Sequence, residues 1–193
     1  MKPMHYIAAL ISSASCAVFA LASEAETSAT AGSSRGYRSG TAAATARYEG
    51  DRGFARTDTR SGRVSLARGV ALGMDEDGLS LSVSHAVAPA GGPAVASNFN
   101  ISLGLDGSVA HSVGLAVADG PIFRSATAGG TSSAGRSGSV AASLASGKTD
   151  SLGTVRVTTH SDGSRPALPA IRRHIDARGG PAVRGYLLHP VRP

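Results

Sequence analysis

The sequence lacks most of the residues that usually stabilise a small domain: it has one cysteine, no tryptophan and an aromatic fraction of only 4%. Cys16 lies close to the N-terminus, so the chain beyond it can have no disulfide, no cysteine-ligated zinc or iron–sulfur site and no cysteine nucleophile. The apolar fraction of 41% is ordinary, but alanine provides much of it. Because burial contributes about 25 cal/mol per Å² and large side chains supply most of that area, the sequence predicts a thin core.

The N-terminal residues have the features of a secretory signal peptide. Lys2 supplies the positive charge, residues 7–22 form an apolar stretch interrupted only by serines, and Ala20 and Ala22 provide the small side chains that signal peptidase requires. This pattern predicts a signal peptide over residues 1–22, cleaved after Ala22, and a secreted or periplasmic protein. Two alternatives remain open. One is an uncleaved anchor, for which the stretch is shorter than the ~20 apolar residues of a spanning helix; the other is a lipoprotein acylated at Cys16.

Residues 23–60 are rich in Ser, Thr, Ala, Gly and Arg and show no sustained apolar period of 2 or 3.6 residues. Such a segment buries too little apolar surface to offset the entropy of ordering the chain. We therefore predict a disordered leader over this range.

From Val64 to residue 118, bulky apolar residues alternate with Ser, Ala and Gly, which is typical of strands that have two different faces. Four such runs are separated by turn sequences rich in Asp, Gly and Pro, at residues 75–78, 89–93 and 106–108. The fold class is therefore mainly β. We predict an antiparallel meander of four strands, or of six if β-prone segments after residue 120 join it, within a β-sheet domain spanning residues 64–160.

The phase of the alternation also fixes the register, because directly opposed residues share a face. Closing the first turn on Met74 and Leu79 places Arg68 opposite His85, and the second turn places His85 opposite Ser97. A polar row formed by Arg68, His85 and Ser97 is expected to cross the bulky face.

After residue 120 the alternation weakens. Residues 122–123, 140–144 and 154–160 are β-prone, whereas residues 128–138 and 146–151 are typical of loops. Further on, Pro169 at a first turn and the glycines at 179–180 predict one short basic helix over residues 169–178.

The C-terminal residues 165–193 form a basic tail, with six arginines against Asp176 and a net charge of +5. Basic segments attract polyanions such as polysaccharides, extracellular DNA and anionic lipid surfaces. The candidate polyanion-binding residues are Arg165, Arg172, Arg173, Arg178, Arg184 and Arg192. The other interpretation is a solubilising tail.

No catalytic, metal or cofactor motif stands out in the chain. Ser97 and His85 could form the nucleophile and base of a small hydrolase, but no acid is expected beside His85 and Ser97 lies within a strand. The histidines show no metal-ligand spacing such as two His four apart on a helix. No phosphate-binding glycine loop occurs, so we expect no cofactor, no metal and no enzymatic activity.

The most distinctive feature is the small-residue face of the predicted sheet, which would allow sheets of separate chains to stack. The alternative is that this face meets solvent. No family is indicated by these motifs. The sequence favours an exported, non-enzymatic structural protein of a cell surface, matrix or envelope; a polyanion-binding module and a small secreted hydrolase are the alternatives.

Overall fold

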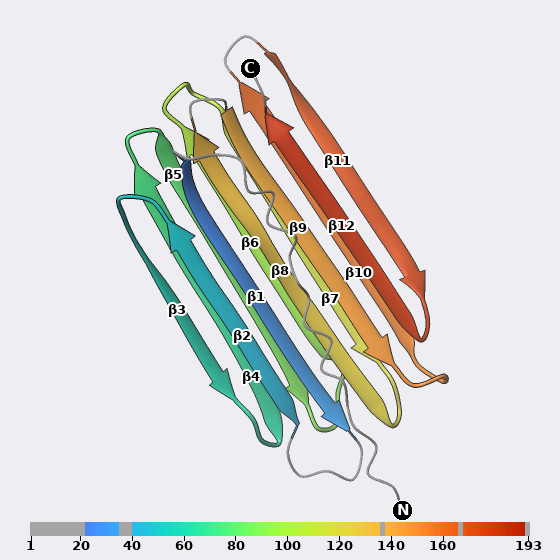
Figure 1. Cartoon of the computed structure of the whole chain (residues 1–193). Helices are drawn as coiled ribbons and strands as arrows, with labels where there is room; N and C mark the ends of the chain where they lie inside the picture. The colour runs from blue at the N-terminus through green and yellow to red at the C-terminus, as the bar shows by residue number, and fades with distance from the viewer. Residues whose placement is uncertain (1–21, 35–39, 136–137, 166–167, 192–193) are drawn as a thin grey trace, which may run out of the picture.

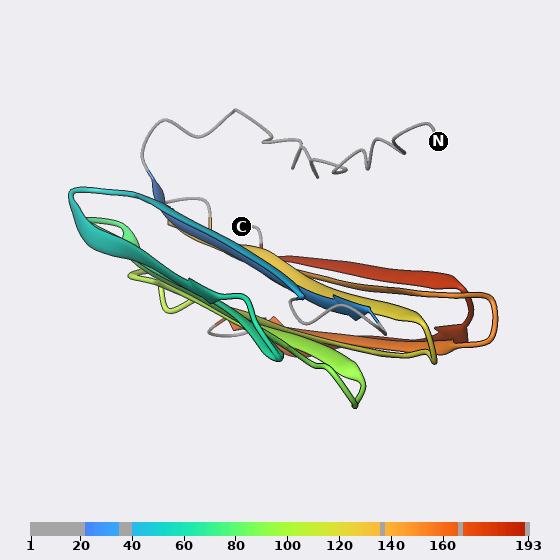
Figure 2. The same cartoon turned by 90° about the horizontal axis from the view of Figure 1, so that it is seen from below.

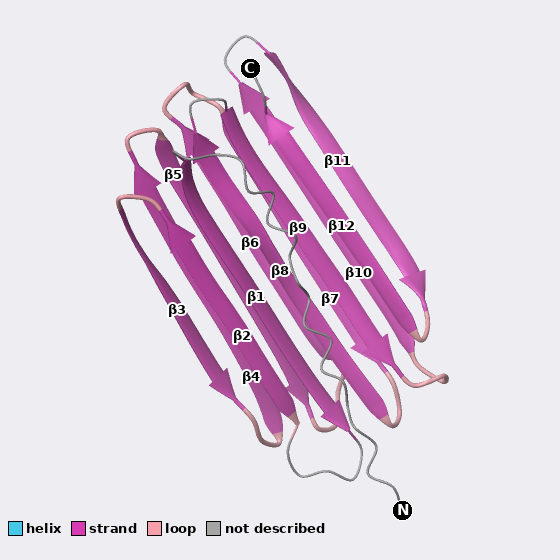
Figure 3. Cartoon of the chain, viewed as in Figure 1, coloured by secondary structure: helices cyan, strands magenta, loops and turns pink. Residues whose placement is uncertain are grey.

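The computed structural model describes residues 22–34, 40–135, 138–165 and 168–191, and in these ranges the chain consists of strands joined by turns, without a helix (Figures 1 and 3). Twelve strands form two antiparallel sheets, one of five strands and one of seven. The two sheets lie flat against one another as a sandwich (Figure 2).

The five-stranded sheet has the order β12-β9-β8-β1-β2. Its strands, in chain order, are β1 (Ala22–Ser34), β2 (Thr41–Glu49), β8 (Phe123–Gly135), β9 (Gly138–Thr149) and β12 (Ala182–Val191). The seven-stranded sheet has the order β11-β10-β7-β6-β5-β4-β3. Its strands are β3 (Arg52–Arg60), β4 (Val64–Asp75), β5 (Gly78–Pro89), β6 (Ala94–Gly104), β7 (Val109–Asp119), β10 (Thr154–Arg165) and β11 (Leu168–Gly179).

The chain passes between the sheets four times. It begins with β1 and β2 in the five-stranded sheet and crosses to form the continuous meander β3 to β7 in the other. It then returns with β8 and β9, crosses again so that β10 pairs with β7, and ends with β12 beside β9. Strands from both ends of the chain thus complete both sheets.

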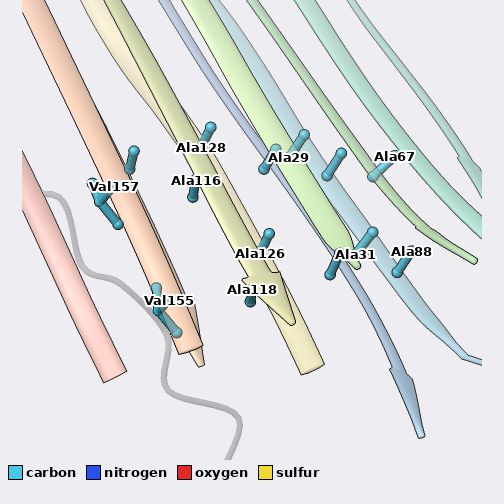
Figure 4. Close-up of a cluster of buried hydrophobic side chains, with 14 residues drawn as sticks. Ala29, Ala31, Ala67, Ala88, Ala116, Ala118, Ala126, Ala128, Val155 and Val157 are labelled. Carbon is cyan, nitrogen blue, oxygen red and sulfur yellow. The ribbon is translucent and has the colours of Figure 1, made fainter. Parts of the chain in front are cut away.

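The small-residue faces of the two sheets pack against each other and form the core. The buried cluster consists of alanines together with Val155 and Val157, contributed by both layers (Figure 4). A buried methyl group contributes only about 0.8 kcal/mol, so this core depends on many small contacts instead of a few large side chains. The sequence-based expectation of a thin core is consistent with this composition.

Because the facing side chains are so small, the two backbones approach closely. A Cβ placed on Gly69 or Gly73 of β4 would lie 2.6 Å from the carbonyl oxygen of Thr45 or Glu24 in the opposite sheet. Sheets in ordinary sandwiches are about 10 Å apart, a distance that one Cβ atom cannot bridge. Glycine is therefore required at these two positions of β4.

Hydroxyl and amide groups within this core bond across the interface between the sheets. The hydroxyls of Ser80, Ser82 and Ser102 donate to the carbonyl oxygens of residues 23, 130 and 133 in the opposite sheet, at 2.8, 3.0 and 2.8 Å. Buried Asn100 donates to the Ala142 carbonyl at 2.9 Å. Buried polar groups are tolerated when they are hydrogen-bonded, and here the bonds also fix how the layers sit on one another.

The meander expected between residues 64 and 118 is confirmed as β4 to β7. Its predicted register is confirmed as well: Met74 pairs with Leu79, Arg68 with His85, and His85 with Ser97. The first predicted turn is held by the Asp75 carboxylate, which accepts hydrogen bonds from the backbone amides of Asp77 and Gly78 at 2.8 and 3.0 Å.

Other expectations were wrong. The range 23–60, expected to be a disordered leader, contains β1, β2 and β3, and the strand number exceeds the four or six expected. Residues 169–178 lie in strand β11 and not in a helix, so the basic tail at 165–193 is part of the sandwich as far as residue 191. The expected loops at 128–138 and 146–151 lie largely within β8 and β9. Pairing with neighbouring strands provides hydrogen bonds for the backbone N–H and C=O groups of these segments, even where bulky and small residues do not alternate in the sequence.

Candidate functional site

The two outer faces of the sandwich differ sharply in chemistry. The outward side chains of the five-stranded sheet are mostly hydroxyl-bearing or charged, as in β1, where Glu24, Glu26, Ser28 and Thr30 are half-buried. The outward side chains of β4 to β7 are bulky and apolar. We call this second surface the apolar sheet face; it comprises Val64, Leu66, Val70, Leu72, Met74, Leu79, Leu81, Val83, Val87, Val95, Phe99, Ile101, Leu103, Val109, Val113, Leu115 and Val117.

Nothing in the described chain covers the apolar sheet face. Leu66, Phe99 and Leu115, on three different strands, are 40%, 39% and 41% exposed. Four strands about 4.8 Å apart, with about five outward side chains each at a spacing of about 6.8 Å, make an outer surface of about 650 Å², of which about 550 Å² is apolar because a few of the outward side chains are polar. The largest apolar patch on a typical monomer is about 300–600 Å² and is often functional, and this one lies at the upper end of that range.

The strand register aligns apolar side chains of neighbouring strands in rows on this face. Val83, Phe99 and Val113 lie directly opposite one another on β5, β6 and β7, and a parallel row brings together Leu81 and Ile101. Directly opposed side chains in an antiparallel pair touch, so these apolar side chains contact one another across the strands.

One polar row interrupts the apolar sheet face. Arg68, His85 and Ser97 form it, as the sequence predicts, and the register adds Asp58 of β3 beyond Arg68. Partial burial, together with the neighbouring Arg68 charge, lowers the pKa of His85 below its usual value. The neighbour of His85 is thus a cation and not an orienting carboxylate, and no hydrogen bond joins His85 to Ser97 within the described ranges. The row lacks the arrangement of a hydrolase triad.

The predicted polyanion-binding arginines are only partly brought together. Arg192, and the side chains of Arg165 and Arg172, lie outside the described part of the structure. The other three, Arg173, Arg178 and Arg184, are exposed on the adjacent strands β11 and β12. Arg178 shares the outer face of the seven-stranded sheet with its cross-strand partner Arg156, whereas the exposed Arg184 projects from the outer face of the other sheet.

An ion pair lies at the same edge of the molecule. Arg156 of β10 donates a hydrogen bond to the Asp176 carboxylate of β11 at 3.0 Å. This bond is the main reason why the pKa of Asp176 lies below its usual value. Both side chains are well exposed, so the pair contributes little to stability.

A cluster of histidines that the sequence analysis did not identify lies between the apolar sheet face and this edge. His111 of β7 and His160 and Asp162 of β10 have donor atoms within 4.8 Å of one another, and all three side chains are half-buried. His174 of β11 follows, with its ring centroid 6.2 Å from that of His160. The alternation of His160 and Asp162 was the only local signal; the contact with His111 depends on β10 pairing with β7.

We compared the chain with known families and structures. No protein-family model, curated protein or solved structure matches it. In the described ranges, no helix has the length and apolar character needed to cross a membrane.

Proposed function

We propose that this protein is an exported, non-enzymatic structural component of a cell surface, matrix or envelope, and that copies of the chain associate through the apolar sheet face. The observation that carries the proposal is the uncovered apolar surface on β4 to β7, opposite a polar outer face. A slab with one apolar and one hydrophilic face is suited to stacking in pairs, with the hydrophilic faces turned to water.

The size of the face supports a second copy of this chain as its occupant. Two such surfaces of about 650 Å² each, with their polar side chains included, would bury about 1,300 Å², which lies within the range of about 1,200–2,000 Å² for stable protein–protein interfaces. The small-residue face, where the sequence pattern predicts stacking between chains, is covered within the chain by the five-stranded sheet. Ser82 and Ala86 on this face are 0% and 1% exposed. Association between copies would use the opposite face.

Export is supported by the sequence pattern of residues 1–22, which lie outside the described part apart from Ala22. The absence of enzymatic activity is proposed because the polar row on the apolar sheet face places Arg68 beside His85. A flat sheet surface also provides no enclosed volume in which a substrate could be desolvated.

The proposal is tested by sedimentation velocity over a wide range of protein concentrations. The unaltered protein is expected to shift from monomer to dimer as concentration rises. Phe99→Asp places a charge at the centre of the apolar sheet face and is expected to leave only monomer. Thr131→Asp, on the outer face of the five-stranded sheet, is the matched control and should dimerise normally. Circular dichroism verifies that both variants are folded.

Two results would overturn self-association. One is a monomer at every concentration of the unaltered protein. The other is a monomer that floats with phosphatidylcholine vesicles through the same face, which would assign that face to a lipid surface instead.

Polyanion binding is the second candidate, favoured by the exposure of Arg173, Arg178 and Arg184 on β11 and β12, which belong to different sheets and contact each other at one edge of the sandwich. It predicts retention on heparin that falls steeply with salt concentration. Retention should decrease in Arg178→Gln and Arg184→Gln. It should be unchanged in Arg56→Gln, an exposed arginine on β3, at the edge of the seven-stranded sheet opposite β11. Equal retention of all three variants would remove this candidate.

A further inference from the structure

The histidine cluster at the border of the apolar sheet face has the composition of a metal site. Half of the chain's six histidines, His111, His160 and His174, lie on three successive strands of one sheet, β7, β10 and β11. Asp162 lies beside them, directly opposite His111 in the register. We propose that His111, His160 and Asp162 bind a divalent transition-metal ion of the zinc type.

The backbone places the three ligands on one face of the sheet. His160 and Asp162 are two residues apart on β10, and residues at this spacing project from the same side of a strand. His111 faces Asp162 directly and is diagonal to His160, and side chains at both kinds of position are within reach of each other. The ring centroids of His111 and His160 are 6.3 Å apart.

The donor atoms are near the separation that a metal needs. All lie within 4.8 Å of one another. Metal–nitrogen distances of about 2.0–2.1 Å in a tetrahedral shell correspond to ligand atoms about 3.3 Å apart. A contraction of at most about 1.5 Å, through rotation of half-buried side chains, would complete the site.

The chemistry of the three ligands favours zinc over magnesium and calcium. Two imidazoles and a carboxylate suit zinc and neighbouring divalent transition metals, whereas magnesium and calcium prefer oxygen ligands alone. Three protein ligands leave one coordination position for water, as in open zinc sites. Asp162 already takes part in another polar interaction, but a carboxylate has two oxygens and can serve both partners.

The immediate surroundings favour binding. Ile101 lies opposite His111, and Val113 lies opposite His160, so apolar side chains flank the imidazoles. His174 lies on the other side of His160 and can help to orient its ring. Neighbours of metal ligands that fix ring orientation commonly change metal affinity by about 10–100-fold.

The test uses the full chain, purified without a polyhistidine tag and titrated with zinc chloride by calorimetry. We expect saturable binding of one ion per chain. Affinity should fall at least about tenfold in His160→Ala and in Asp162→Asn, as is seen even for outer-sphere partners. His85→Ala is the matched control, because His85 is exposed on the same sheet face but lies opposite Arg68 and Ser97, and its affinity should be unchanged.

A second measurement does not depend on the variants. Zinc should shift the imidazole NMR signals of His111 and His160 in the unaltered protein and leave those of His85 in place. Three outcomes would overturn the proposal: no saturable binding, equal affinity of His160→Ala and His85→Ala, or zinc-dependent shifts confined to other histidines.

Discussion

Ser82 and Ser84 lie on the same inward face of β5, and both are fully buried, but their hydroxyl groups have different surroundings. The Ser82 hydroxyl lies 2.8 Å from that of Thr27, 2.6 Å from the Asn100 side-chain oxygen and 3.0 Å from the Gly130 carbonyl oxygen. The Ser84 hydroxyl has no hydrogen-bond partner among the described residues. The two serine-to-alanine substitutions therefore remove the same hydroxyl group from two different environments.

The magnitudes follow from the hydrogen bonds. A hydroxyl has one proton, so Ser82 makes about two bonds at a time, each contributing about 1 kcal/mol. Ser82→Ala should lower the free energy of unfolding by about 2 kcal/mol. A domain of this size loses about 2–4 °C of Tm per kcal/mol, which gives a decrease of about 4–8 °C. Ser84→Ala removes an unsatisfied buried hydroxyl, whose burial costs about 1–3 kcal/mol, and should leave stability unchanged or raise it.

Chemical denaturation of both variants, with the slope of unfolding checked for constancy, measures these differences. Equal destabilisation by the two substitutions would refute the reasoning, because it would mean that a hydroxyl with hydrogen-bond partners contributes no more to stability than one without.

Two further predictions concern the inner and outer surfaces. Gly73→Ala should lower the free energy of unfolding by about 1–3 kcal/mol, because the added Cβ would lie 2.5 and 2.6 Å from the backbone oxygens of Glu49 and Glu24. Gly91→Ala is the control, because no atom lies within 4 Å of a Cβ placed there. Equal effects of the two substitutions would contradict close packing of the backbones. Burial, with the facing Glu49, raises the pKa of Glu24 above 4.5, so the folded state holds this proton more tightly and stability falls as pH rises from 4.5 through the raised pKa. Glu24→Gln should remove that decrease and stabilise the protein at neutral pH in urea unfolding; an unaltered pH profile would contradict this assignment.

Alternation of large and small residues made part of this fold predictable. In β4 to β7, residues such as Leu72, Leu81 and Ile101 contrast strongly with their small neighbours, so strand limits, turns and register could all be derived. The polar row through His85 followed from the same phase.

The remaining strands could not be predicted because they lack that contrast. In β1, small inward residues such as Ala25 and Ala29 alternate with Glu24 and Glu26, so no apolar period is evident. β8 and β9 consist mainly of Ser, Ala, Gly and Thr and are typical of loops until a second sheet is present to pack on them. Their stability comes from the facing layer, which a local pattern does not reveal.

The candidate sites depended on the same long-range pairing. The histidine cluster needs β10 to lie beside β7, although β8 and β9 separate them along the chain. The sequence pattern of β4 to β7 also did not show which face of the meander points into the core, since either the bulky or the small-residue face could have been turned inward. The matching small-residue face of the second sheet decided it.

The central claim is that small residues form the interior and bulky residues the exterior. Single cysteines in a Cys16→Ser background test it through maleimide labelling of dilute, folded protein. Val87→Cys and Leu115→Cys, at positions 37% and 41% exposed, should react nearly as fast as in the unfolded chain. Ala86→Cys and Ala116→Cys, at positions 1% and 0% exposed, should react only after unfolding. Faster labelling at 86 and 116 than at 87 and 115 would show the sheet turned the other way and would contradict the account.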